Sequence, residues 1–289
     1  MNNTAINIIL LVFVILTWGY SWVLMKIGLG YAEPLTFAAW RCAIGAAALI
    51  AYMKFRGLEW PAVKSWPDYI MVGLFQTTLM FGFMLFGMKR ITAGKTSVLL
   101  YTMPIWTILL VHFYLKQRLT AGKWAGVVLG SAGILSILGW DIIINQNLQI
   151  FLGELMIITG AISWAIANIW VKKRMSGEDV YKVSTLQLTF GTVGLIILAI
   201  PTHGIFNIEW TAYSIYILVF TGLVASAVDF TIWFYLIKKL DINITTFSSM
   251  LVPVFGLIFD WIILGNRLDP GTVLGGVLII AGIYRISRK

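Results

Sequence analysis

The sequence is poor in charge, cysteine and histidine. Only 11% of its 289 residues are charged, against about 25% in a typical soluble domain, whereas 60% are hydrophobic. A single cysteine, Cys42, excludes a disulfide within the chain and a cluster of thiolate metal ligands. The two histidines, His112 and His203, stand apart, and the chain has no metal-binding, phosphate-binding or nucleophile motif. The sequence therefore argues against an enzyme and predicts neither a cofactor nor a metal site.

The apolar residues gather in long runs with brief connections between them. A helix that crosses a lipid bilayer needs about 20 mainly apolar residues. Ten spans are predicted: 5–25, 36–53, 69–88, 96–115, 122–140, 151–171, 183–201, 212–235, 243–264 and 271–286. The first run has no basic segment and no small-residue cleavage site, so we expect it to be retained. The expected fold class is an all-α membrane protein with ten transmembrane helices.

The net charge of +9 comes from Lys and Arg residues in the short loops between these runs. This placement indicates membrane topology rather than a nucleic-acid-binding face. With a cytoplasmic N-terminus, 15 of the 21 basic residues fall in cytoplasmic segments, five fall outside and Arg41 lies within a span. Both termini are therefore predicted to be cytoplasmic. The loop 89–95, with three cations on the outside, is the exception to this pattern.

The chain contains an internal repeat. An offset of 146 residues pairs Trp18 with Trp164, Lys26 with Lys172 and Gly45 with Gly191. Further along, an offset of 149 pairs Gly73 with Gly222, Lys89 with Lys238, Pro104 with Pro253, Arg118 with Arg267, Gly122 with Gly271, Gly126 with Gly275 and Gly133 with Gly282. Across 104–137, 12 of 34 positions are identical without a gap. We predict two repeats of five spans each, at 1–145 and 146–289.

Because five is an odd number, the second repeat must enter the membrane from the opposite side to the first. Two inverted repeats create a site near the middle of the bilayer that can open to either face, which is typical of secondary transporters. A passive channel or facilitator is the first alternative, and a membrane receptor or enzyme is the second. The partners expected are the lipid bilayer and a small-molecule substrate, with no nucleic acid.

Several motifs occur in a recognisable order. They are TWGYSWVLMK at 17–26, EPLTFAAWR at 33–41, and P-x13-RL-x2-G-x3-G beginning at Pro104 and again at Pro253. In this order, and doubled, they resemble the EamA family of the drug/metabolite transporter superfamily. The resemblance implies a plasma-membrane carrier of metabolites, often an exporter of amino acids or drugs, with either a proton as coupling ion or facilitated exchange.

The resemblance also carries over to individual positions, with one departure. Trp18 and Gly19 fall on a Trp-Gly pair of the first helix, Arg41 on an arginine of the second, and Glu154 on an acidic position that opens the sixth. The family commonly has Gly-Glu-Arg at the ends of the fourth and ninth helices. Here these places read Lys116-Gln117-Arg118 and Gly265-Asn266-Arg267, so a role assigned to those glutamates does not transfer.

Three ionisable residues lie within predicted spans: Arg41, Asp229 and Asp260. Such residues are costly in lipid and are functional candidates by default. Arg41 serves either as a structural anchor, paired with a carbonyl or with Asp260, or as a contact for a substrate carboxylate. Asp229 is either a proton-coupling or amine-binding group, or a neutral carboxyl that bonds to a neighbouring helix. Asp260 lies near the end of its span, where it is expected to reach water.

Tryptophan usually anchors helices at the membrane surface. Trp18 lies well inside its span, however, and Trp22 follows one turn later on the same face. Trp164 repeats the pattern, with Asn168 one turn on, and an asparagine gains nothing from lipid contact. We therefore predict a substrate cavity lined by Trp18, Trp22, Gln76, Tyr101, Trp164, Asn168 and Ser249.

Glycine and proline also recur at regular positions. Gly122, Gly126 and Gly130 form a stripe of small residues, which indicates close helix packing within the chain or in a homodimer. Pro104 and Pro253 each remove a backbone donor inside a span and predict two matched kinks. These kinks are either gates or a shape inherited from the duplication.

Overall fold

The computed structural model describes residues 3–114, 116, 118–144, 147–202, 204–239 and 250–287. Nine helical segments among them are long and apolar enough to cross a membrane, and Leu251–Leu264 is a shorter apolar helix. These ten segments match the predicted spans, and the all-helical membrane fold is confirmed. The first part of the predicted span 243–264 falls in 243–249, which lies outside the described residues.

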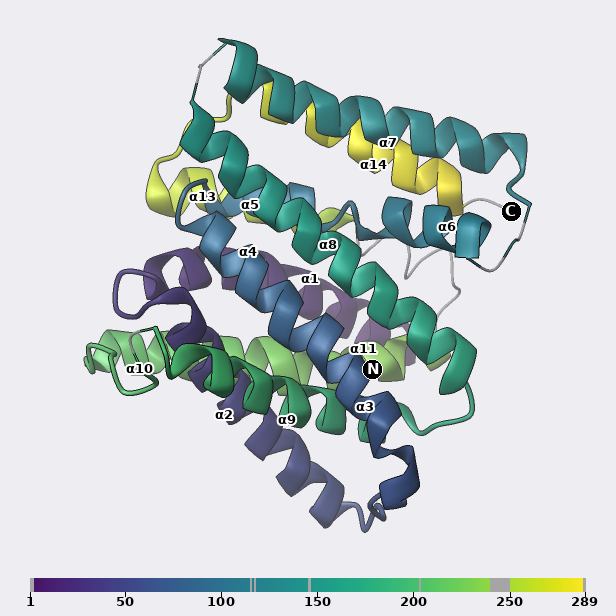
Figure 1. Cartoon of the computed structure of the whole chain (residues 1–289), viewed down its shortest axis with the longest axis vertical. Coiled ribbons are helices and arrows are strands. Elements are labelled where there is room, and N and C mark those ends of the chain that lie inside the picture. Colours follow the sequence, from purple (N-terminus) through teal and green to yellow (C-terminus); the bar gives the residue numbers. More distant parts are fainter. Residues whose placement is uncertain are drawn as a thin grey trace.

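The helical elements follow the spans in chain order, and several spans are built from more than one element (Figure 1). The first five spans are α1 (Asn3–Gly28), α2 (Pro34–Phe55), η1–α3–η2–α4 (Val63–Ser65, Trp66–Gly73, Leu74–Leu79, Met80–Met88), α5–α6 (Ala93–Leu100, Met103–Tyr114) and α7–η3 (Ala121–Gly139, Trp140–Ile144). The second five are α8 (Leu148–Arg174), α9 (Val180–Ala199), α10–η4–α11 (Ala212–Val219, Phe220–Val228, Asp229–Lys239), α13 (Leu251–Leu264) and α14 (Pro270–Ser287).

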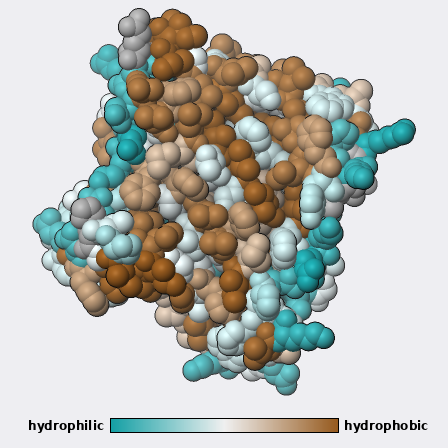
Figure 2. All heavy atoms as spheres, viewed as in Figure 1, coloured by the Kyte–Doolittle hydropathy of each residue, from teal (hydrophilic) through white to brown (hydrophobic). Residues whose placement is uncertain are grey.

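Successive spans run in alternate directions, so the structure has two ends. The N-terminal side is the end at which α1 begins and α14 finishes, toward the right of Figure 1. The far side is the other end, where α5, α8, α10 and α14 begin. Figure 2 shows hydrophobic residues over most of one face, with hydrophilic residues gathered toward these two ends. This distribution is what a lipid bilayer around the middle of the molecule requires.

Close glycine contacts show that the two halves are related by an approximate two-fold axis. A Cβ added to Gly45 would lie 2.8 Å from the carbonyl oxygen of Gly222, and one added to Gly191 would lie 2.7 Å from that of Gly73. Gly45 matches Gly191 and Gly73 matches Gly222 in the repeat, so this is one contact made twice with the halves exchanged. The inverted repeat predicted from the sequence thus has a physical counterpart in the packing.

The same relation appears in two π-helical segments, η2 in the third span and η4 in the eighth. The wide turns of a π-helix are frequent at functional sites. In η2, the Thr77 hydroxyl donates to the side-chain oxygen of Gln187 over 2.6 Å. In η4, the carbonyl oxygen of Thr221 accepts from Arg41 Nη2 over 3.0 Å. Arg41 and Gln187 occupy equivalent positions in the two repeats, so one structural device holds a cation in one half and an amide in the other.

The glycine stripe of the fifth span packs against the tenth span of the same chain. A Cβ on Gly126 or on Gly133 would lie 2.6 Å from the carbonyl oxygen of Gly282 or Gly275, respectively. The contact between α7 and α14 therefore uses this surface within the monomer. The glycine stripe therefore gives no support to a homodimer, and the homodimer stays a prediction.

A methyl group at this contact should destabilise the fold. Gly133→Ala places a Cβ where the α14 backbone already lies, and we expect it to lower the free energy of unfolding by about 1–3 kcal/mol. Gly122→Ala is the matched control on the same helix, because the nearest atom to its Cβ is a side-chain oxygen 3.9 Å away. Melting of the purified protein in detergent measures both. Equal melting temperatures for the two variants would show that α7 and α14 accommodate the added methyl group without a loss of stability.

Several cations on the far side are held by protein partners. Lys26 Nζ donates to the carbonyl oxygens of Met88 and Ile91 over 2.5 and 2.8 Å, and Lys89 Nζ pairs with Glu33 over 2.7 Å. Lys95 was counted with a loop in the sequence, but it lies in α5 and is buried. Loop 89–95 therefore contributes fewer unpaired cations to the far side than its sequence indicates. The orientation of the termini stays a prediction.

Candidate functional site

A cavity of about 300 Å³ lies between the two halves of the molecule. Its walls come from spans one to four and six to eight. The lining residues are Trp18, Ser21, Trp22, Met25, Arg41, Leu49, Gln76, Thr77, Met80, Phe81, Met84, Leu100, Tyr101, Met103, Pro104, Trp164, Ser184, Gln187, Leu188, Ala225, Ser226, Phe230 and Trp233. The wall is therefore mainly aromatic and aliphatic, with one cation, two amides and a few hydroxyls, the composition of a small-molecule site.

Five of the seven predicted cavity residues line this space: Trp18, Trp22, Gln76, Tyr101 and Trp164. Arg41 and Pro104 line it too. Asn168 does not, because its Nδ2 turns to the sulfur of Met103 at 3.1 Å, and Met103 stands between it and the cavity. Ser249 lies outside the described residues.

Trp18 is fixed by its polar and apolar contacts rather than by lipid. Its indole Nε1 donates to the carbonyl oxygen of Ala225 over 2.9 Å. Its ring centroid lies 5.4 Å from that of Trp233 and 5.6 Å from that of Phe230, both on the adjacent helix α11. An anchor at the membrane surface would instead direct its N–H group to water or headgroups.

Removing this N–H group while keeping an aromatic ring should weaken the fold. We expect Trp18→Phe to lower the free energy of unfolding by about 1 kcal/mol, because the carbonyl of Ala225 loses its donor. Trp261 is exposed on the apolar surface and provides the control, since Trp261→Phe should change stability by less than about 0.5 kcal/mol. Thermal unfolding in detergent measures both. A larger loss of stability for Trp261→Phe than for Trp18→Phe would contradict the interpretation of Trp18 as a core residue and Trp261 as a surface residue.

Trp22, Tyr101 and Trp164 continue the aromatic wall. The ring centroid of Tyr101 lies 6.4 Å from that of Trp22 and 6.5 Å from that of Trp164, edge to face in both cases. Two tryptophans from different repeats thus flank one tyrosine from the fourth span. Rings in this arrangement present both faces and edges to an apolar or cationic guest.

Arg41 is buried, with 3% of its surface exposed, and it is the only charged residue among the described residues that line the cavity. Its Nη2 donates to Thr221 O and to Ser226 Oγ, over 3.0 and 3.2 Å. Its guanidinium carbon lies 4.4 Å above the centre of the Phe81 ring. Nε and Nη1 have no hydrogen-bond partner among the described residues. Of the two structural partners considered for Arg41, the structure shows the backbone carbonyl, that of Thr221 in η4, and no ion pair with Asp260 among the described residues.

Asp229 and Asp260 are both buried away from the cavity wall. Asp229 Oδ2 accepts from the Thr17 hydroxyl over 2.7 Å. Asp229 directly precedes Phe230, which lines the cavity. Asp260 does not reach water as predicted. Its side chain is fully buried beside Gly94, and its Oδ1 accepts from Asn266 Nδ2 over 3.0 Å.

The two prolines mark the interruptions of their spans. The fourth span breaks between α5 and α6, and Pro104 is the second residue of α6, so the predicted kink is a true break. Pro253 is the third residue of α13, and the residues of its span before 250 lie outside the described part. Both prolines border a second cavity of about 30 Å³ between α5, α6, α13 and α14.

The residues that line the cavity differ in how much of their surface is exposed. Lining residues nearest the far side are buried, as in Met25 and Met84, which lie within one turn or so of the ends of α1 and α4. Trp18, Trp164 and Trp233, in the middle or nearer the N-terminal side, keep part of their surface exposed. Among the described residues, the partly exposed part of the wall thus lies in the middle and toward the N-terminal side, although Leu49 on that side is buried.

Sequence reasoning missed several lining residues, notably Phe81, Gln187, Ser226, Phe230 and Trp233. Gln187 could have been predicted from the sequence, because it occupies the position in the second repeat that is equivalent to Arg41. The others sit among apolar residues whose pattern gives no sign of which face meets the cavity. Only the packing of α4, η4 and α11 selects that face.

Comparison with known proteins agrees with this architecture. The model of the EamA-like transporter family matches the chain twice, at residues 5–139 and 151–288. The uncharacterized transporter YoaV of Bacillus subtilis is 32% identical over 95% of this chain and 94% of its own length. A probable amino-acid metabolite efflux pump of Escherichia coli is 28% identical over 96% of this chain and 93% of its own length.

A solved crystal structure shares the fold at a TM-score of 0.65 and 19% identity, with 97% of this chain and 96% of the other covered. The matches extend over nearly the whole chain and include both repeats. They are matches to transporters and not to enzymes. The chain is therefore a member of the EamA-like transporter family, within the drug/metabolite transporter superfamily.

Proposed function

We propose that this transporter carries a small amphipathic metabolite with a carboxylate group, such as an amino acid, and that the central cavity binds it. The observation that carries the proposal is Arg41, a charged residue of a cavity lined by aromatic rings, whose Nε and Nη1 have no hydrogen-bond partner among the described residues. A buried guanidinium with unused donors matches a carboxylate, which accepts charge-assisted hydrogen bonds from it. The tryptophans and methionines would hold the apolar part of the same molecule.

The size of the cavity supports a small cargo. About 300 Å³ is at the lower end of the roughly 300–1,000 Å³ that ligand sites occupy. Gln76, Gln187 and Ser21 add neutral hydrogen-bonding groups that would orient a polar head. The names of relatives as probable amino-acid metabolite efflux pumps support this class of cargo and an outward direction.

Alternating access is the mechanism that the inverted halves support. From the partly exposed tryptophans we infer that the cavity is accessible from the N-terminal side in the present arrangement, and exchange of the conformations of the two halves would open the far side instead. The basic residues of the loops favour a cytoplasmic N-terminal side in the plasma membrane. The cargo would then load from the cytoplasm and leave outside.

Flux into proteoliposomes tests this proposal against its alternatives. Labelled L-phenylalanine is the first probe, and phenethylamine, which lacks only the carboxylate, is its control. A carrier gives saturable flux that unlabelled phenylalanine on the opposite side accelerates. Flux that is linear in concentration and unaffected by the opposite side would indicate a channel, and a chemically changed product would indicate an enzyme.

A further inference from the structure

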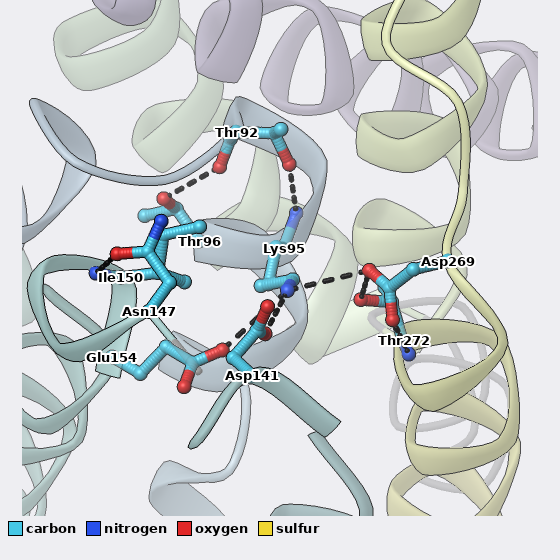
Figure 3. Close-up of polar contacts among 9 residues, drawn as sticks. All are labelled: Thr92, Lys95, Thr96, Asp141, Asn147, Ile150, Glu154, Asp269 and Thr272. Atoms are coloured by element: carbon cyan, nitrogen blue, oxygen red, sulfur yellow. Dashed lines mark hydrogen bonds and ion pairs between the residues drawn. The ribbon is translucent and has the colours of Figure 1, made fainter. Parts of the chain in front are cut away.

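Four charged residues meet at the far side, outside the cavity wall (Figure 3). Lys95 of α5 pairs with Asp141 of η3, and its Nζ lies 3.3 Å from Asp269 Oδ2 and 3.5 Å from Glu154 Oε1. Lys95 and Asp141 belong to the first repeat, whereas Glu154 in α8 and Asp269 before α14 belong to the second. We call these four residues the far-side cluster. It joins the two halves at the far side, where Met25 and Met84 of the cavity wall are buried.

The cluster has more negative groups than positive ones, and it is largely shielded from water. The side-chain exposed fractions are 7% for Lys95, 2% for Asp141, 0% for Glu154 and 27% for Asp269. Burial raises the pKa of Asp269, but hydrogen bonds from the Thr272 backbone N–H and hydroxyl, together with the Lys95 ammonium, outweigh it and hold the pKa below its ordinary value. Asp269 is therefore ionised at neutral pH, and one ammonium faces three carboxyl groups.

Glu154 is the member without adequate partners. Neither of its carboxyl oxygens accepts a hydrogen bond among the described residues, and Lys95 is nearer to both other carboxylates. A buried carboxylate without hydrogen bonds pays a desolvation cost of several kcal/mol. The Glu154 carboxyl faces that of Asp141 in Figure 3, and two ionised carboxylates would repel each other there.

We propose that Glu154 binds a proton in this closed arrangement, donates it in a hydrogen bond to Asp141, and so holds the far side shut. The proton removes one negative charge from the cluster and turns a repulsive contact into a bond across the two halves. Lys95 then balances Asp141, and Asp269 stays ionised at the more exposed edge. This protonation and hydrogen bond involve no residue outside the far-side cluster.

Other charged groups nearby are directed elsewhere. Arg90, at the end of α4 beside Gly153, bonds to Gln149 and to the carbonyl of Phe86 at the exposed surface. Asp260 of α13 bonds to Asn266. Among the described residues, the charged groups beside Glu154 are therefore Lys95 and Asp141, and Asp269 lies on the other side of Lys95.

The consequence for transport rests on the alternating access proposed above. When the far side opens, Glu154 meets water, where a glutamate titrates at about pH 4.3 and is ionised at neutral pH. The closed state therefore binds one more proton than the open state. Linkage makes the ratio of closed to open molecules rise up to about tenfold for each unit by which the pH on the far side falls.

Infrared spectroscopy tests the proton directly and needs no substrate. The full chain in lipid nanodiscs at neutral pH should show the carbonyl stretch of a protonated carboxyl group, and Glu154→Gln should lose that component. Asp229→Asn is the matched control, since it removes another fully buried carboxyl and should leave the component in place. Asp141→Asn keeps Glu154 but frees Lys95 to pair with it, so this component should disappear there too. A component that survives in both cluster variants overturns the proposal.

A pair of spin labels tests the gate. Gly30→Cys and Arg267→Cys place labels at exposed far-side positions in different halves, with the buried Cys42 left in place. Acidification should shift the population toward the shorter distance, whereas Glu154→Gln should show the short distance at every pH. An equal pH response in Glu154→Gln, or none in the parent, overturns the proposal. Both readouts can succeed with no flux of phenylalanine, so failure of the proposed cargo is distinguishable.

Discussion

Arg41→Met is expected to weaken the binding of L-phenylalanine by more than about thirtyfold. Removing one partner from a buried, hydrogen-bonded charge pair costs about 2–5 kcal/mol, and each 1.4 kcal/mol is a factor of ten in affinity. Methionine fills much of the same volume against the Phe81 ring, so the change is mainly the loss of the guanidinium donors. Equilibrium binding to the purified protein in nanodiscs measures the effect.

Two controls separate loss of the charge from loss of the fold. Phenethylamine lacks the carboxylate, so Arg41→Met should bind it no more weakly than the parent protein does. Arg41→Lys keeps a positive charge but loses the planar pair of donors, and it should give an intermediate affinity for phenylalanine. If both probes weaken together, Arg41 supports the structure through Thr221 and Ser226 rather than contacting the cargo.

The sequence predicted the fold well because lipid imposes a simple rule on it. Runs of apolar residues give the spans, and glycines and prolines at a fixed offset give the repeat. The matched glycines were informative for a physical reason, since all of them except Gly122 lie where a backbone of the other half approaches too closely for a side chain. Gly45 and Gly191 were visible as a pair in the sequence, although their contacts with Gly222 and Gly73 were not.

The cavity was predicted in part, and the failures have a common cause. Trp18, Trp22 and Trp164 could be found because tryptophan deep in a span is unusual. Asn168 is equally unusual, but it satisfies its amide on Met103, and a sequence does not show which neighbour a polar side chain will choose. The far-side cluster is the clearest case, because Lys95, Asp141, Glu154 and Asp269 are scattered along the chain and read as loop charges or as a family motif until the fold joins them.

Lys95→Met is expected to lower the free energy of unfolding by about 3–5 kcal/mol, because it leaves buried carboxylates without their cation. The loss should be smaller at pH 5 than at pH 8, since protons can then replace the ammonium. Lys89→Met is the control, as it breaks an exposed pair with Glu33 that contributes at most about 1 kcal/mol. Thermal unfolding in detergent measures the stability loss of each of the two variants at pH 5 and at pH 8.

A second substitution shows whether the cost is electrostatic. Asp141→Asn added to Lys95→Met removes the carboxylate that the lysine balanced, so part of the lost stability should return even though a second native residue is gone. Simple packing damage would instead make the double variant less stable than either single one. Recovery that is larger at pH 8 than at pH 5 would identify like-charge repulsion as the force, because only ionised carboxylates repel one another and acid neutralises them.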